Sequence, residues 1–174
     1  MSNQVKSVLS SVAEKTLGDL AFVFSMPAEE EQVRDAMRAA VVEFTGPFSG
    51  EFIAAVTAQN LPAIAANMLG FEEEGGAPPT DVQQEDALKE LTNVVCGNLL
   101  PTIAGTEVVF NIAAPVVVAD EDFRKRAGQG EMVAHVHLTL DEGEAEFLFF
   151  VKGGEAAMED WVGLGAGAGE AEGD

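Results

Sequence analysis

Two successive stretches of this chain carry the same order of sequence patterns, and this repetition limits the folds that are open to it. Each stretch begins with apolar residues at helical spacing, continues with a short apolar run, and ends in two β-rich runs separated by a turn. The helical patterns cover about 4–17 and about 83–99, and an offset near 76 residues places Glu14 on Glu90. The repetition predicts an α+β domain with pseudo-twofold symmetry, built from duplicated units.

The β-rich runs predict one antiparallel sheet of about six strands, with the two main helices on one face. A further short helix is expected at Leu61–Leu69, where Gly70 stops it. The charged segment 29–35 and the acidic Gly- and Pro-containing segment 71–81 are expected to be exposed connections. The expected strands cover 20–26, 39–44, 51–57, 108–118, 131–140 and 142–151.

The chain is strongly acidic, because 30 Asp and Glu against 9 Lys and Arg give a formal net charge of −21. Such a charge repels nucleic acids and anionic lipid surfaces, so we expect neither a nucleic acid nor a membrane as a partner. No apolar run reaches the roughly eighteen residues that a membrane span needs, and the N-terminal sequence lacks the apolar centre of a signal peptide. We therefore expect a cytoplasmic protein.

The length of 174 residues suits a single domain. We expect this domain to cover 1–162 and a disordered acidic, glycine-rich tail to cover 163–174, because GLGAGAGEAEGD has almost nothing to bury. Trp161, with Met158 and Val162, is expected to pack on the core rather than to form a partner-binding patch.

The second helical pattern, within QQEDALKELTNVVCGNLL, has one polar side and one apolar side. At 100° per residue, Asp86, Glu90, Asn93 and Gly97 fall within about 60° of one another, and we call these four residues the polar stripe. The helix can pack its apolar side on the sheet while the stripe faces outward. A glycine inside a helix costs about 1 kcal/mol relative to alanine, and at Gly97 close approach of another molecule would compensate for this cost.

Two residues of the stripe suit chemistry on a phosphoryl group. Glu90 and Asn93 are three residues apart, so both side chains can reach one site on a partner. A carboxamide can orient a water molecule without adding negative charge beside a phosphoryl group, and a carboxylate can grip a partner's lysine. The alternative is a solvated helix face without a function, since short motifs also arise by chance.

The segment DALKELTNVVCGNLLP resembles the signature of the CheC, CheX and FliY chemotaxis phosphatases. In that signature Asp or Ser, a Glu four residues later and an Asn three residues further on lie on one helix, and the flanking ELTNVVCGN is most similar to CheX. Pro115 lies near the position of a proline that the family carries a little over twenty residues beyond its Asn. GEFIAAVTAQNLPAIAANMLG also resembles the segment before the signature helix, and the resemblance covers about 4–152.

The resemblance implies a protein phosphatase that hydrolyses the aspartyl phosphate of a CheY-like response regulator. Glu90 would pair with the active-site lysine of the regulator, and Asn93 would position the attacking water. Asp86 matches the first position of the signature, and Asp86 and Gly97 are assigned to partner binding. The resemblance implies no cofactor in this chain, because the Mg²⁺ ion would belong to the regulator.

The first helical pattern carries a degenerate copy of the signature. Ser10 and Glu14 match its first two positions, whereas Leu17 replaces the asparagine. If the asparagine is needed to position water, this helix carries no active site, and one site per chain is expected, as in CheX. The resemblance also implies a homodimer.

Several other readings stay open from the sequence. The main rival is a noncatalytic adaptor of chemotaxis or of the flagellar switch, which would bind a response regulator through the same helix face. A plain structural domain with an accidental motif would leave the glycine at position 97 without an explanation.

His135 and His137 alternate on one strand face without a third ligand nearby, so we expect paired strand histidines and no metal. Cys96 is expected to be a small buried apolar residue rather than a nucleophile.

Overall fold

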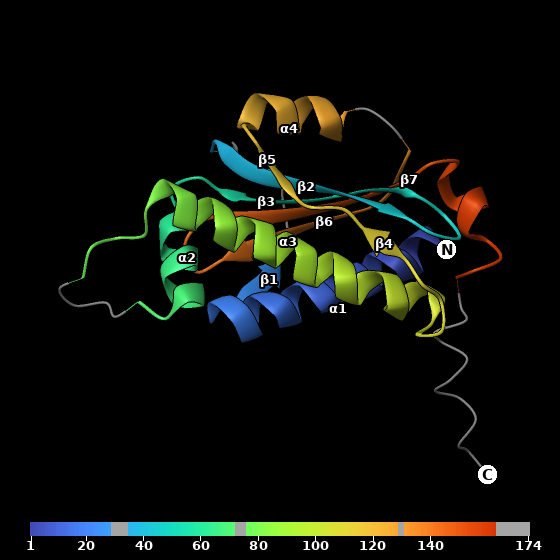
Figure 1. Ribbon diagram of the computed structural model, residues 1–174, viewed down its shortest axis with the longest axis horizontal. Helices are drawn as coiled ribbons and strands as arrows, with labels where there is room; N and C mark the ends of the chain where they lie inside the picture. Colours follow the sequence, from blue (N-terminus) through green and yellow to red (C-terminus); the bar gives the residue numbers. More distant parts are fainter. Residues whose placement is uncertain (29–34, 72–75, 129–130, 163–174) are drawn as a thin grey trace, which may run out of the picture.

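A computed structural model describes residues 1–28, 35–71, 76–128 and 131–162. The helices are α1 (Ser2–Ala21), α2 (Leu61–Leu69), α3 (Asp81–Ala104) and α4 (Asp120–Ala127). The strands are β1 (Ser25–Pro27), β2 (Met37–Thr45), β3 (Gly50–Thr57), β4 (Asn111–Ile112), β5 (Val116–Val118), β6 (Met132–Leu140) and β7 (Glu144–Val151). A short 3-10 helix, η1 (Gly154–Met158), follows β7. Figure 1 shows helices on both sides of one sheet. The expected α+β class is therefore confirmed.

The described strands form a seven-stranded antiparallel sheet in the order β1-β6-β7-β3-β2-β4, and β5 also pairs with β2. The two central strands come from different halves of the chain, since β3 pairs with β7 from Gly50 opposite Val151 to Val56 opposite Ala145. On either side the halves exchange a strand: β1 pairs with the hairpin β6–β7, and β5 pairs with the hairpin β2–β3. This exchange gives the sheet the pseudo-twofold order that the repeated patterns predict.

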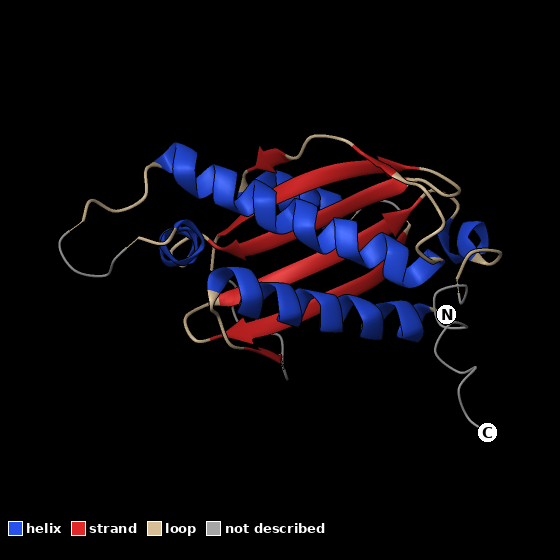
Figure 2. Ribbon diagram, turned by 60° about the horizontal axis from the view of Figure 1, so that its bottom comes forward, coloured by secondary structure: helices blue, strands red, loops and turns tan. Residues whose placement is uncertain are grey.

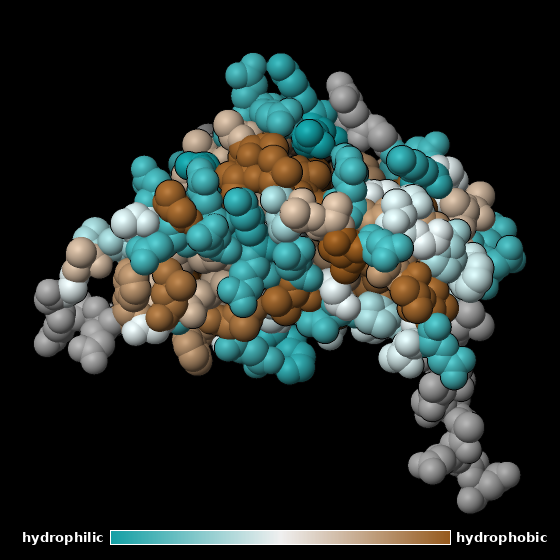
Figure 3. Space-filling model, in the orientation of Figure 1, coloured by the Kyte–Doolittle hydropathy of each residue, from teal (hydrophilic) through white to brown (hydrophobic). Residues whose placement is uncertain are grey.

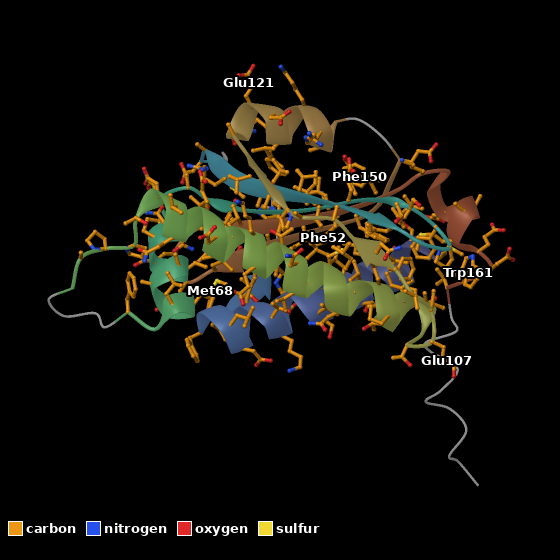
Figure 4. All side chains as sticks on the ribbon, in the orientation of Figure 1. Phe52, Met68, Glu107, Glu121, Phe150 and Trp161 are labelled. Carbon is orange, nitrogen blue, oxygen red and sulfur yellow. The ribbon has the colours of Figure 1, made fainter. Side chains whose placement is uncertain are left out.

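The long helices α1 and α3 lie side by side across one face of the sheet (Figure 2), and the sequence colours of Figure 1 show that they run in opposite directions. The main core lies between them and the sheet, and Figure 4 places Phe52 on this side. The N-terminus of α3 is held by a capping box, in which the Thr80 hydroxyl accepts the Gln83 N–H at 3.2 Å and the Gln83 side chain accepts the Thr80 N–H at 2.9 Å. Core residues of this layer include Leu9, Leu17, Phe52, Leu88, Leu91, Val95 and Phe147.

The second face of the sheet is covered in part by α4, which the sequence analysis does not predict. Its sequence DEDFRKRA contains one large apolar residue, Phe123, which is buried against Ile53, Leu148 and Phe150. Acidic residues occupy its first turn and basic residues its last, as the helix dipole favours, and Arg124 binds Asp120 at 2.7 Å. A single large apolar residue gives no helical periodicity, so the sequence pattern does not predict this helix.

The expected strand over 20–26 is wrong in its first part. Buried Leu17 and Ala21 continue the apolar face of α1 to its end, and Phe22 then adopts a left-handed backbone conformation that stops the helix. The strand over 108–118 is also wrong as one element, because β4 and β5 are separate short strands with Pro115 between them. The division of this run into two strands raises the sheet from about six expected strands to seven.

Most of the other expected elements are confirmed, and some expected segments lie outside the described residues. The helix Leu61–Leu69 and both long hairpins are confirmed, and Trp161 and Val162 pack against the core beside buried Met158. Residues 29–34 and 72–75 of the expected connections, and the whole tail 163–174, lie outside the described residues. No helix among the described residues is long and apolar enough to cross a membrane.

Candidate functional site

The polar stripe lies on the outer face of α3. Asp86, Glu90, Asn93 and Gly97 are all exposed, whereas the other side of α3 is buried on the sheet. The helical period of the sequence therefore places all four residues on the outer face, as expected. A convex helix face of this kind suits contact with another protein better than enclosure of a small molecule.

The two central side chains of the stripe have unused hydrogen-bonding groups. Within the described part of the chain, neither Glu90 nor Asn93 forms a side-chain hydrogen bond or an ion pair. The neighbouring Glu85 differs, since it binds Arg38 of β2 at 2.9 Å. Glu90 and Asn93 are thus available to a partner, while Glu85 is held in the fold.

Gly97 leaves an open space on the same face. A Cβ atom built there would have no neighbouring atom within 4 Å. Four residues later stands Pro101, which has no N–H to donate to the Gly97 carbonyl. Among the residues that the structure describes, none packs closely on Gly97, so its lack of a side chain leaves room for the backbone or side chain of a partner.

The matching positions of α1 are arranged differently. The Ser10 hydroxyl donates to the Glu14 carboxylate at 2.8 Å, and both residues are partly buried. Leu17, at the asparagine position, is fully buried in the core. The helix α1 thus presents no carboxamide here, and its glutamate already has a partner.

The rival residues also have structural partners. His135 faces Glu146 at 3.2 Å and His137 faces Glu144 at 3.0 Å, on the β6–β7 hairpin. No group of three or more possible metal ligands occurs among the described residues.

Cys96 is fully buried, and burial raises the pKa of its thiol to about 12, so the thiolate needed by a nucleophile is disfavoured. Its expected role as a buried apolar residue is confirmed.

A groove that the sequence analysis missed lies on the α4 side of the sheet. It has a volume of about 810 Å³ and is lined by acidic and basic side chains, among them Lys125, Arg126 and Lys152. Arg126 binds Glu51 at 3.3 Å across it. Its residues come from α4 and from strand ends, so only a prediction of α4 could have revealed it. The groove includes no residue of α3 and is separate from the polar stripe.

The chain is similar to one known protein family. The family model described as "Chemotaxis phosphatase CheX" matches residues 38–139, which include the whole stripe. No curated protein matches the chain.

Three solved structures show the same fold at low sequence identity. CheX from Desulfovibrio desulfuricans is 19% identical, with a TM-score of 0.62 over 86% of this chain and 99% of that one. CheX from Vibrio vulnificus is 18% identical, with a TM-score of 0.65 over 87% and 99%. The CheX-CheY-BeF3-Mg complex from Borrelia burgdorferi is 17% identical, with a TM-score of 0.60 over 84% and 96%. Since the family match spans more than half of the sequence, this chain belongs to the CheX family.

Proposed function

We propose that this protein hydrolyses the aspartyl phosphate of a CheY-like response regulator. The observation that carries the proposal is the exposed pair Glu90 and Asn93 on α3, whose side chains have no partner within the described residues. Membership of the CheX family supports a function in chemotaxis. The Borrelia structure pairs a CheX with a CheY, which supports a regulator as the partner.

Asn93 positions the water in the proposed reaction. Its carbonyl oxygen accepts a hydrogen bond from the water, and the water oxygen attacks phosphorus in line with the bond to the aspartyl oxygen. The P–O bond to the aspartate breaks, and inorganic phosphate leaves while the regulator regains its carboxylate. The regulator's own Mg²⁺ neutralises charge on the phosphoryl oxygens. A neutral carboxamide suits this position because a carboxylate would repel those oxygens.

Glu90 holds the regulator in register for this attack. Its carboxylate lies one helical turn from Asn93 and pairs with the lysine beside the phosphoryl group. Asp86 and Gly97 extend the contact along the same face. We further propose that the domain covers 1–162, that it acts in the cytoplasm, where response regulators work, and that it forms a homodimer.

The first test is dephosphorylation of regulators charged with acetyl phosphate, with this protein at substoichiometric amounts. Asn93→Ala is expected to lower kcat by about a hundredfold or more, because water is no longer oriented. Asn98→Ala removes another exposed carboxamide from α3 and should leave kcat unchanged. Turnover by Asn93→Ala at the wild-type rate would refute the role of this residue.

A second variant tests the docking role of Glu90. Glu90→Gln keeps the shape and removes the charge, so KM for the phosphorylated regulator should rise about tenfold or more, as expected for a charge-assisted hydrogen bond. Glu14→Gln, at the matching position of α1, should leave KM unchanged. An unaltered KM in Glu90→Gln would remove the lysine contact from the mechanism.

The same assay separates catalysis from the adaptor alternative. An adaptor would bind the regulator but release no phosphate above the rate of regulator alone. Binding without turnover, for every regulator of the organism, would replace the phosphatase with the adaptor.

A further inference from the structure

Three large apolar side chains are exposed together at one end of the helix layer. They are Phe22, Leu69 and Phe71, with exposed fractions of 75%, 44% and 36%, and we call them the apolar end patch. The Asn67 side chain donates to the Ala21 carbonyl at 2.9 Å, which ties the end of α2 to the last turn of α1. Residues about fifty positions apart thus meet at one place (Figure 1, Figure 2), and Figure 3 shows apolar side chains gathered over α2.

Phe22 is the residue of this patch that the fold itself explains least. Its backbone has φ 53° and ψ 33°, and it is the only residue other than glycine with positive φ in the described ranges. Glycine or asparagine adopts this helix-ending conformation more readily than a bulky aromatic residue. The ring is also mostly in water, so neither the backbone nor burial within this chain favours phenylalanine here.

The patch lies at one end of the helix layer that also carries the polar stripe. Helix α2 packs against both α1 and α3, and Val82, four residues before Asp86 on the same face of α3, is 66% exposed. Eleven residues separate Val82 from Asn93, which is about 16 Å along a helix. A stable protein partner covers about 800 Å² on each side, or about 30 Å across. A partner centred on Asn93 therefore extends to about the level of Val82, at the end of α3 that Figure 1 shows beside α2.

The charge of this chain restricts which partners it attracts over long range. The stripe carries the carboxylates of Asp86 and Glu90, and the chain has a net charge of −21, so long-range attraction is confined to partners with a basic surface. Burial of exposed apolar side chains supplies affinity that does not depend on charge. The end patch offers such side chains at one end of the same helix layer.

We propose that a response regulator docked on α3 also buries the apolar end patch under an apolar part of its own surface, so that the stripe places the phosphoryl group while the patch supplies affinity. The inference rests on the proposed function and extends it from the reacting residues to the docking surface. It predicts that changes in the patch affect binding and leave the chemical step intact.

The test uses Phe22→Asn and Leu69→Ser in the full chain, with Val109→Ser as a matched control. Val109 is 77% exposed and lies beyond α3, near Glu107, which Figure 4 places at the opposite end of the molecule from Met68 of α2. Binding to a beryllofluoride-charged regulator and the kcat and KM of dephosphorylation are measured for each. Phe22→Asn should weaken binding and raise KM by about tenfold with kcat unchanged. Its thermal stability should be equal or higher, because asparagine suits the positive φ.

Each outcome decides between the two proposals. Unchanged affinity and KM in both patch variants would overturn the docking inference while the phosphatase stands. Binding that weakens in the patch variants, without turnover by any variant, would support the patch and overturn the phosphatase. A wild-type chain that binds no charged regulator would overturn both. A patch variant that changes only the sedimentation coefficient would assign the patch to a second copy of this chain, and the regulator would be the wrong occupant.

Discussion

Gly97 shows how a single residue can carry opposite effects on stability and on function. It is an exposed glycine inside α3, and a methyl group added there meets no atom within 4 Å. Alanine at this position should stabilise the helix by about 0.5–1 kcal/mol, because glycine loses more backbone entropy on folding. Under the proposed function, the same methyl group would project toward the docked regulator.

Gly97→Ala is therefore expected to raise Tm and to raise KM for the phosphorylated regulator by several-fold or more. Gly18→Ala is the matched control, because Gly18 is also an exposed helical glycine with nothing within 4 Å of its Cβ position, but on α1. It should raise Tm by a similar amount and leave KM unchanged. Equal kinetics for both variants would mean that no partner approaches Gly97.

At the scale of the elements, one carboxylate joins α4 to the sheet. Asp120 accepts a hydrogen bond from Arg124 at 2.7 Å and another from the Met37 N–H at 2.9 Å, which joins the start of α4 to β2. The hydrogen bond from Arg124 lowers the pKa of Asp120, opposed by partial burial and supported by the Met37 N–H. A lowered pKa means that the folded state favours the ionised carboxylate.

This lowered pKa predicts a loss of stability in acid. The stabilisation is present above the unfolded pKa, near 3.9, and is lost as the pH falls through the folded pKa below that value. Asp120→Asn should thus unfold at lower urea than the wild type at pH 7, and the difference should shrink between about pH 4 and pH 2. Urea midpoints measured across this range check the prediction, and a difference that stays constant with pH would contradict it.

The same comparison of elements shows what the sequence could and could not predict. The helix α3 has a complete apolar side, so its period alone places Glu90 and Asn93 on the outer face. The apolar run around Ala21 is too short for its sequence pattern to distinguish a helix from a strand. It is helical as far as Ala21 because Leu17 and Ala21 are buried against the core. Helix α4 is held by Phe123 and by contacts to β2, which are distant in sequence. The groove and the end patch follow from such distant contacts and could not be predicted.

For the whole molecule, the net charge of −21 acts on folding as well as on docking. Like charges on a compact chain repel one another, and salt shortens the range of this repulsion from about 30 Å at 0.01 M to about 10 Å at 0.1 M. Tm should therefore rise when NaCl increases from about 10 to 150 mM. Thermal scans with an uncharged osmolyte of equal osmolarity provide the control, and a Tm that falls or stays constant with salt would refute this account.

The exchange of β1 and β5 between the two hairpins bears on the ancestry of the fold. Each half completes the sheet of the other, so the arrangement is the one that two identical half-length chains would form as a strand-swapped pair. After fusion of such a pair into a single gene, the two helices could change in sequence independently of each other. One helix could then carry a buried residue where the other carries an exposed one, as Leu17 of α1 and Asn93 of α3 do now.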